Sequence, residues 1–206
     1  MARKTKEEAL KTYHAILDAS AELFSNQGIS HTTLNDIAKH TGMTRGAVYW
    51  HFENKEDVIK ALWQRDAADR LDKTLGELTN LNKQTPVEHF KTIVKNMVRN
   101  VSEDTPHSIA VRIVINSGEA TTIPSDLQAF LDDKGRRIFD AFCQATQTLQ
   151  ELGVATKEMP SNILAASLWS YIHGLVDLNL RSGDDRINLS ESGDQLLEFY
   201  FQNWFK

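Results

Sequence analysis

Residues 31–57 read HTTLNDIAKHTGMTRGAVYWHFENKED, and this stretch decides the fold of the N-terminal part of the chain. Thr33 is followed three residues later by Asp36, a spacing that predicts a capping box at the start of a short helix. Gly42 lies where the chain has to turn, because only glycine adopts a positive φ at little cost. Thr44 can then cap a second helix. The stretch therefore predicts two short helices joined by a tight turn, which is a helix-turn-helix.

The predicted second helix has one apolar face, formed by Ala47, Val48 and Phe52, and one face with unusual residues. That outer face holds Arg45, Gly46, Tyr49, Trp50 and His51. Outward Tyr and Trp indicate a surface for a partner, although both rings could instead pack on the preceding helix as core. Gly46 costs about 1 kcal/mol relative to alanine inside a helix. Its presence fits either a close approach of a DNA backbone or relief of packing.

The same stretch resembles a known family. The pattern T-x-x-x-I-A-x-x-x-G-x-T-R-G-A-V-Y-W-H-F-x-x-K, from Thr33 to Lys55, looks like the TetR family of bacterial transcriptional regulators. The basic start Arg3-Lys4-Thr5-Lys6 and the apolar spacing from Ile16 to Gly28 resemble the AcrR-like branch, which represses multidrug efflux genes. The resemblance is dense over residues 1–63 and thin afterwards.

The resemblance and the helix ends together give candidate DNA contacts. Arg45 is the candidate for reading a guanine edge, because its guanidinium can form two hydrogen bonds there. Contacts to phosphates and thymine methyls are expected from Tyr49, Trp50 and His51, as at matching positions of the family. Helix N-termini also favour phosphate. Thr33, Thr44 and Lys55 lie at predicted helix N-termini and are therefore further candidates. The full predicted set is Thr33, Thr44, Arg45, Gly46, Tyr49, Trp50, His51 and Lys55.

Charge alone does not indicate a nucleic-acid partner. The 206 residues carry a formal net charge of −5, and residues 1–60 hold eight basic and eight acidic side chains. Cys143 is the single cysteine, which rules out an intrachain disulfide and leaves a buried structural thiol or a redox sensor. No apolar run is long enough to span a bilayer, and no signal-peptide core begins the chain. We expect a cytoplasmic protein without a membrane partner.

Helical periodicity runs through the whole chain, so the fold class is all-α, with about nine helices. We expect a three-helix DNA-binding head over residues 1–55 and a helical body over residues 56–206. One long helix is predicted from Lys55 to about Gly76. Another is predicted to begin at a capping box formed by Thr85 and Glu88, with Pro86 at its first position.

The last two predicted helices, about 161–181 and 190–205, indicate an interface. The first is apolar nearly all round, and the second carries five aromatic residues. The resemblance implies homodimers formed by the last two helices, and two heads would read a pseudo-palindromic operator. An alternative is that both helices only complete an internal core. The predicted dimer contacts are Leu168, Ile172, Leu175, Leu196, Phe199 and Tyr200.

The resemblance also implies that the body binds a small-molecule inducer, which we expect to be lipophilic. Candidate lining residues are Trp63, Phe90, Met97, Asn116, Glu119, Phe142, Trp169 and His173. The apolar members could equally be core, and His173 a satisfied core or interface histidine. Asn116 and Glu119 could belong to a solvated, salt-bridged stripe with Arg112. If Glu119 faces the pocket, it favours a cationic inducer.

These patterns lead to one function with one alternative. The prediction is a homodimeric repressor that binds an operator in double-stranded DNA and is released by the inducer, controlling multidrug efflux genes. The alternative is a DNA-binding regulator of the same fold without an inducer, controlled by a protein partner or acting on DNA organisation. The sequence has no HExxH, phosphate loop, nucleophile elbow or Cys/His cluster, so we expect no enzyme, metal or cofactor.

Overall fold

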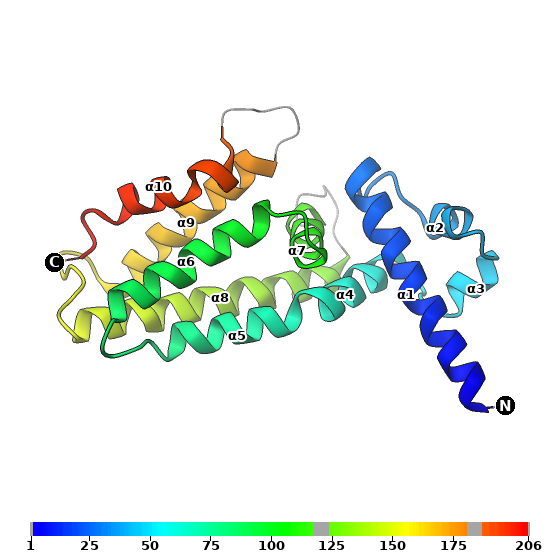
Figure 1. The fold of residues 1–206 in the computed structure, drawn as a ribbon, viewed down its shortest axis with the longest axis horizontal. Coiled ribbons are helices and arrows are strands. Elements are labelled where there is room, and N and C mark those ends of the chain that lie inside the picture. Colours follow the sequence, from blue (N-terminus) through cyan, green and yellow to red (C-terminus); the bar gives the residue numbers. More distant parts are fainter. Residues whose placement is uncertain (1, 118–123, 181–186, 206) are drawn as a thin grey trace. The chain divides into compact units, whose positions relative to one another are not determined.

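Helices make up most of the computed structural model, which describes residues 2–117, 124–180 and 187–205, and side chains from residue 5 onward. Ten are found in these ranges (Figure 1). They are α1 (Ala2–Gln27), α2 (Leu34–Thr41), α3 (Arg45–Tyr49), α4 (Lys55–Asp66), α5 (Ala68–Thr79), α6 (Pro86–Ser102), α7 (Pro106–Ser117), α8 (Ser125–Glu151), α9 (Ser161–Leu180) and α10 (Leu189–Phe201). The predicted all-α fold with an N-terminal helix-turn-helix is confirmed.

Two local predictions about the helices are wrong. The helix expected from Lys55 to about Gly76 is divided into α4 and α5, because Ala67 leaves helical geometry at φ −128° and ψ −26°. Helix α6 begins at Pro86 as predicted, but Thr85 makes no side-chain cap hydrogen bond. At φ −135° and ψ 57°, Thr85 lacks the extended backbone that presents a cap hydroxyl to the first amides of a helix.

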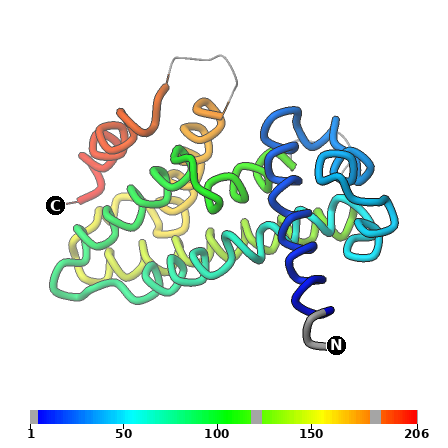
Figure 2. The backbone as a smooth tube through the Cα atoms, turned by 45° about the vertical axis from the view of Figure 1, so that its right-hand side comes forward, coloured from blue at the N-terminus to red at the C-terminus, as the bar shows by residue number. Residues whose placement is uncertain are grey.

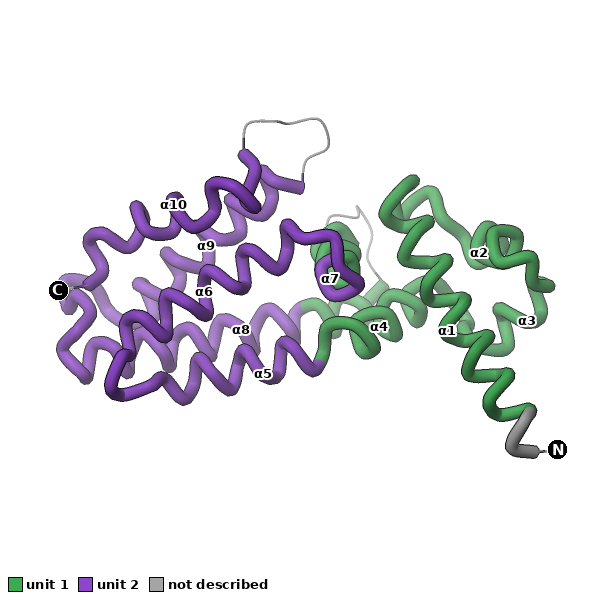
Figure 3. The backbone as a smooth tube through the Cα atoms, in the orientation of Figure 1, with its two compact units in different colours: residues 1–68, 109–131 green, residues 69–108, 132–206 purple. Residues whose placement is uncertain are grey.

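The chain divides into two compact units (Figure 3). Unit 1 comprises residues 1–68 and 109–131, and unit 2 comprises residues 69–108 and 132–206. Within unit 1, α1 packs against α2 and α4, and α2 packs against α3. The side chains that make this core include Ile16, Leu17, Leu34, Ile37, Val48, Phe52, Val58 and Leu62, all of which are buried. This core fixes where α3 lies on the head.

Helix α4 also contacts the start of α8 within unit 1. Lys60 forms an ion pair with Asp126, and the ring of Trp63 lies edge-on to Phe130 with 6.3 Å between centroids. On its other side, α4 is joined to α1 by the ion pair of Arg65 with Asp18. The compact unit that holds the helix-turn-helix therefore includes the first turns of α8.

Unit 2 is a bundle in which α6 packs against α9 and α10. Helices α5 and α8 lie side by side in two views (Figure 1, Figure 2), and the ion pair of Arg137 with Asp72 joins them. The core is rich in large apolar side chains, among them Phe90, Phe142, Leu149, Leu168, Leu197 and Phe201. Cys143 of α8 is half-buried rather than buried, and burial raises the pKa of its thiol.

No helix in the described ranges is both long and apolar enough to cross a membrane.

Candidate nucleic-acid interface

Helix α2 has the predicted cap at each end. The Thr33 hydroxyl accepts a hydrogen bond from the Asp36 amide at 3.2 Å, and the Asp36 carboxylate accepts one from the Thr33 amide at 3.0 Å. The hydrogen bonds from Thr33 lower the pKa of Asp36. At the other end, Gly42 has φ 68° and ψ 15°, and the next amide, of Met43, donates to the Ala38 carbonyl at 3.0 Å. The predicted capping box and glycine turn are confirmed.

The caps determine how α3 is presented. Thr44 caps α3, because its hydroxyl accepts a hydrogen bond from the Ala47 amide at 3.2 Å. Val48 and, just after the helix, Phe52 are buried in the core of unit 1. Because these two side chains fix the inner face, Arg45, Gly46, Tyr49 and Trp50 are left exposed on the other side of this short, capped segment.

The outer face of α3 carries two large exposed aromatic rings. Tyr49 is 47% exposed and Trp50 is 73% exposed, and Arg45 and Gly46 are exposed beside them. The alternative that both rings are core is therefore wrong. A Cβ atom added to Gly46 would meet no protein atom within 4 Å, so packing within the chain does not explain this glycine either. We name Arg45, Gly46, Tyr49 and Trp50 the reading face.

His51 differs from the prediction that placed it outward. It is half-buried in an aromatic cluster, with ring centroids 5.8 Å from Tyr13 and 4.6 Å from Trp50. Tyr13 of α1 in turn stacks on Phe52 at 5.2 Å. Burial lowers the pKa of His51. This aromatic cluster packs against the reading face through Trp50. Tyr13 belongs to the cluster and was not predicted from the sequence.

Lys55 also has a role inside unit 1. Its Nζ donates to the carbonyl of Ile29 at 2.8 Å, and the side chain is half-buried. Asn54 caps α4 by accepting a hydrogen bond from the Asp57 amide at 2.8 Å. Thr33, Thr44 and Lys55 therefore each fix part of the motif, whereas Arg45, Tyr49 and Trp50 of the reading face are exposed to solvent.

The predicted ligand residues are distributed over both units. In unit 2, Phe90, Phe142, Trp169 and His173 form a row of ring contacts, with centroid distances of 6.5, 6.0 and 4.1 Å between successive members. Phe90 and Phe142 are fully buried, so they are core residues, while Met97 is half-buried. The His173 side chain is exposed overall, yet partial burial against Trp169 lowers its pKa.

The remaining ligand residues lie elsewhere. Trp63 and Asn116 belong to unit 1, where Trp63 is buried and Asn116 is exposed. Glu119 lies outside the described residues. Among the residues that are described, no group of three His, Cys, Asp or Glu side chains is placed to hold a metal ion.

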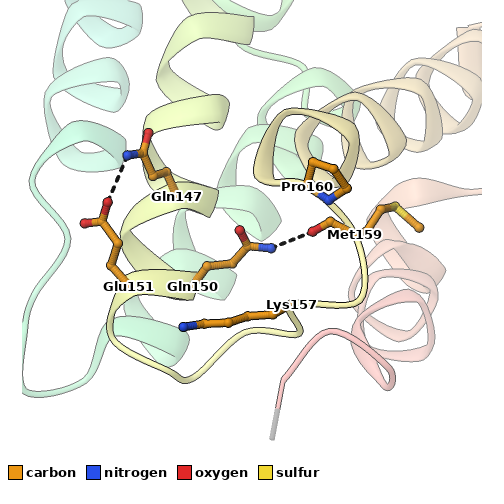
Figure 4. A pocket seen from close by; sticks show the side chains of 6 residues that line it. All are labelled: Gln147, Gln150, Glu151, Lys157, Met159 and Pro160. Atoms are coloured by element: carbon orange, nitrogen blue, oxygen red, sulfur yellow. Dashed lines mark hydrogen bonds between the residues drawn. The ribbon is translucent and has the colours of Figure 1, made fainter.

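An open hollow of about 400 Å³ lies at the turn between α8 and α9 (Figure 4). It is lined by Gln147, Gln150, Glu151, Lys157, Met159 and Pro160, and so by none of the predicted ligand residues. The Gln150 amide already donates to the Met159 carbonyl at 2.8 Å, and Gln147 donates to Glu151 at 2.8 Å. Both glutamine side chains that line this hollow are already hydrogen-bonded within the chain, and none of the predicted ligand residues lies there.

The predicted dimer residues separate into two groups. Leu168, Ile172 and Leu175 are buried within a single chain, so they are not available to a partner. Phe199 of α10, in contrast, is 71% exposed. Leu196 and Tyr200 are half-buried. Among the predicted dimer residues, Phe199 is therefore the one most accessible to a partner, and the buried leucines are not.

Comparison with known proteins tests the resemblance. Residues 16–62 match the family model of bacterial regulatory proteins of the tetR family. The chain is 29% identical over 186 residues to the HTH-type transcriptional regulator AcrR of Shigella flexneri. The aligned region covers 86% of this chain and 82% of AcrR. The chain therefore resembles the TetR family, by its head in the family model and over most of its length in AcrR. The predicted resemblance to this family and to its AcrR-like branch is confirmed.

Other relatives match either the head in sequence or nearly the whole chain in structure. A probable acrEF/envCD operon repressor of Escherichia coli is 49% identical over 63 residues, which is 31% of this chain and 29% of that protein. Among solved structures, a SmeT–triclosan complex is 25% identical, covers 95% of this chain and 92% of its own, and has a TM-score of 0.78. NalD of Pseudomonas aeruginosa, at 24% identity and a TM-score of 0.81 with 97% and 98% coverage, shares the fold.

These relatives decide the broad function. The TetR-family relatives are transcriptional regulators, so this chain is a DNA-binding regulator and not an enzyme. The reading face of α3 exposes one guanidinium, two aromatic rings with polar ends, and a glycine with open space where a Cβ would be.

Proposed function

We propose that the protein is a homodimeric repressor that binds a pseudo-palindromic operator through the reading face of α3. The observation that carries this proposal is the exposure of Arg45, Tyr49 and Trp50 on a short helix whose caps and inner face are fixed. Such a helix fits the major groove of DNA, where its first residues reach base edges. The functional division into a head over residues 1–55 and a body over residues 56–206 is part of the proposal.

The regulated genes are proposed from the relatives. AcrR and the probable acrEF/envCD operon repressor match the head, and NalD is the secondary repressor of the MexAB-OprM multidrug efflux pump. We infer that this protein represses efflux genes and acts in the cytoplasm, where a bacterial operator lies. Gene expression should rise at an adjacent efflux operon when the protein is deleted, and unchanged expression there would remove the efflux role.

The proposed inducer is a small lipophilic molecule. A relative, SmeT, has been solved with triclosan, which supports this class of ligand. Of the ring side chains predicted for the ligand in unit 2, Trp169 is half-buried and His173 is exposed, with 4.1 Å between their ring centroids, so these two are accessible to a ligand. A cationic preference rests on Glu119 alone. Wild type should bind cationic dyes more tightly than anionic dyes, and Glu119→Gln should lose this difference. Equal binding of both dyes by both proteins contradicts the preference.

The dimer is proposed from affinity and from Phe199. One short recognition helix makes few base contacts, so two symmetric heads are needed for a useful affinity. The exposed ring of Phe199 offers an apolar contact on the C-terminal helices.

The role of Arg45 tests the reading face directly. Arg45→Ala should weaken operator binding by about 1–3 kcal/mol and relax the preference at one base position. The measurement is competition binding with operators that each carry one substituted base pair. Uniform weakening across all of them would make Arg45 a phosphate contact.

A further inference from the structure

Lys55 joins the two ends of the DNA-reading motif. It is the first residue of α4, and its Nζ donates to the carbonyl of Ile29, 26 residues earlier in the chain, at 2.8 Å. Helix α2, the glycine turn and α3 all lie between these two residues. One side-chain hydrogen bond therefore closes the whole motif into a loop.

Both partners of this hydrogen bond are held in place by their surroundings. The Ile29 carbonyl also accepts the Thr32 amide at 3.3 Å, and the Thr32 hydroxyl, which is fully buried, donates to the Gly28 carbonyl at 2.8 Å. This turn leads directly to Thr33, the cap of α2. At the other end, the Asn54 cap fixes the backbone of Lys55. The bond thus connects the turn before α2 to the start of α4.

A hydrogen bond from an ammonium to a carbonyl is charge-assisted and stronger than one between neutral groups. The half-buried position of Lys55 also shields it from salt. Lys39 in the same head differs, because its side chain is 81% exposed and its ion pair with Asp36 at 3.8 Å stays within α2. Of these two lysines, only Lys55 connects separate elements.

We propose that Lys55 is a positioning residue, which pre-organises α2 and α3 for DNA by holding the Ile29 carbonyl. The inference rests on the proposed function, because it assumes that α3 reads an operator. It assigns Lys55 a role in the free protein, in addition to the phosphate contact predicted from its place at a helix N-terminus. Pre-organisation raises affinity by lowering the entropy lost when the motif is ordered on DNA.

The test compares Lys55→Met with Lys39→Met, which also removes one positive charge, and with Lys55→Arg, whose guanidinium can still donate to the carbonyl. All are made in the full chain. Hydrogen exchange of the DNA-free protein is measured first. In Lys55→Met the protection of the Thr32 amide should fall about tenfold, the scale of one hydrogen bond to a charged group. Lys39→Met should match wild type, and Lys55→Arg should keep most of the protection.

Operator affinity is then measured against salt, with DNA selected by the wild type. The inference predicts that Lys55→Met binds more weakly than Lys39→Met at every salt concentration. Unchanged protection in Lys55→Met overturns it, and so does lost protection with unchanged affinity. A decrease of about 0.9 in the salt slope without lost protection identifies a phosphate contact instead. If the wild type selects no DNA, the proposed function is contradicted. The hydrogen-exchange result then still tests whether Lys55 holds the Ile29 carbonyl in the free protein.

Discussion

A substitution at Gly46 tests protein stability and the proposed DNA binding at a single position. It lies in the first turn of α3, is exposed, and has no protein atom within 4 Å of the place where a Cβ would be. Gly46→Ala should therefore raise the free energy of unfolding by about 0.5–1 kcal/mol, because alanine loses less backbone entropy in a helix. The same methyl group should lower operator affinity, since it projects toward the proposed DNA.

Urea denaturation and fluorescence anisotropy measure these two effects on the same variant. Gly42→Ala is the control for the backbone, because φ 68° disfavours any residue with a Cβ and should destabilise the head by about 1–2 kcal/mol. A Gly46→Ala variant that is more stable and binds the operator as tightly as wild type contradicts the proposed close approach of DNA.

His51 should make the stability of the head depend on pH. Its pKa is lowered by burial, so the folded head binds a proton less readily than the unfolded chain does. Stability is therefore expected to fall as the pH drops below the ordinary histidine pKa of about 6.5. His51→Gln should reduce the loss of unfolding free energy between about pH 7.5 and 5.5.

The control for this measurement is His31→Gln, which removes an exposed imidazole from the turn before α2. Chemical denaturation across the pH range gives the free energies. An unchanged pH dependence in His51→Gln would show that the aromatic cluster with Tyr13 and Trp50 does not oppose protonation.

Local sequence spacing predicted the caps of the reading motif but not its long-range contacts. Thr33 with Asp36, Gly42, and Thr44 were predictable because each acts on residues within one helical turn. The hydrogen bond from Lys55 to Ile29 and the ring of Tyr13 were not, because each joins residues far apart in sequence. Such contacts exist only after α1, α3 and α4 have packed.

At the scale of elements, α4 contacts α1 on one side and the first turns of α8 on another. Arg65 pairs with Asp18 at 2.8 Å, and Lys60 pairs with Asp126, whose pKa is lowered chiefly by the hydrogen bond from Lys60. The Lys60–Asp126 pair is partly exposed, so its contribution should be modest. We predict a weak coupling between the two side chains, because solvent screens an exposed ion pair.

A charge-swap cycle measures that coupling. Lys60→Glu and Asp126→Lys should each lower the free energy of unfolding, and the double variant should recover most of the loss because opposite charges face each other again. Thermal or chemical denaturation of the four proteins gives the cycle. If the two effects add, the pair does not hold α4 to α8.

Two helix boundaries could not be predicted from the apolar periodicity or the local spacing of the sequence. The apolar line of Ile59, Leu62, Trp63 and Leu71 continues across the junction of α4 and α5, so the sequence predicted one helix. The break falls at Ala67, which is a good helix former and is buried. Likewise, Thr85 and Glu88 have the spacing of a capping box without forming one. At the buried Ala67 the backbone geometry is set by packing and not by local preference, whereas the exposed Thr85 has no structural explanation for its missing cap.

At the scale of the molecule, Phe199 is the residue on which the proposed dimer depends most. Because its ring is 71% exposed, Phe199→Glu should leave the fold of a single chain intact. It should shift the protein toward monomers and weaken operator binding, since a buried charge opposes association. Sedimentation velocity measures the oligomeric state, and far-UV circular dichroism measures whether the chain is folded.

Leu152→Glu is the matched control, because it places the same charge on another exposed apolar residue, at the end of α8. It should sediment like wild type. If Phe199→Glu also sediments like wild type, the dimer does not form through this part of α10. If both variants become monomeric, the interface extends beyond α9 and α10.

The central claim is that two α3 helices of a dimer read one symmetric operator. The most direct measurement is selection of genomic DNA fragments by the purified full-length protein, followed by hydroxyl-radical footprinting of the enriched sequence. We expect a pseudo-palindrome whose half-sites are one or more helical turns apart, each protected by one head, and loss of enrichment with Arg45→Ala. Enrichment of no sequence, or of a single asymmetric half-site that survives Arg45→Ala, would contradict it.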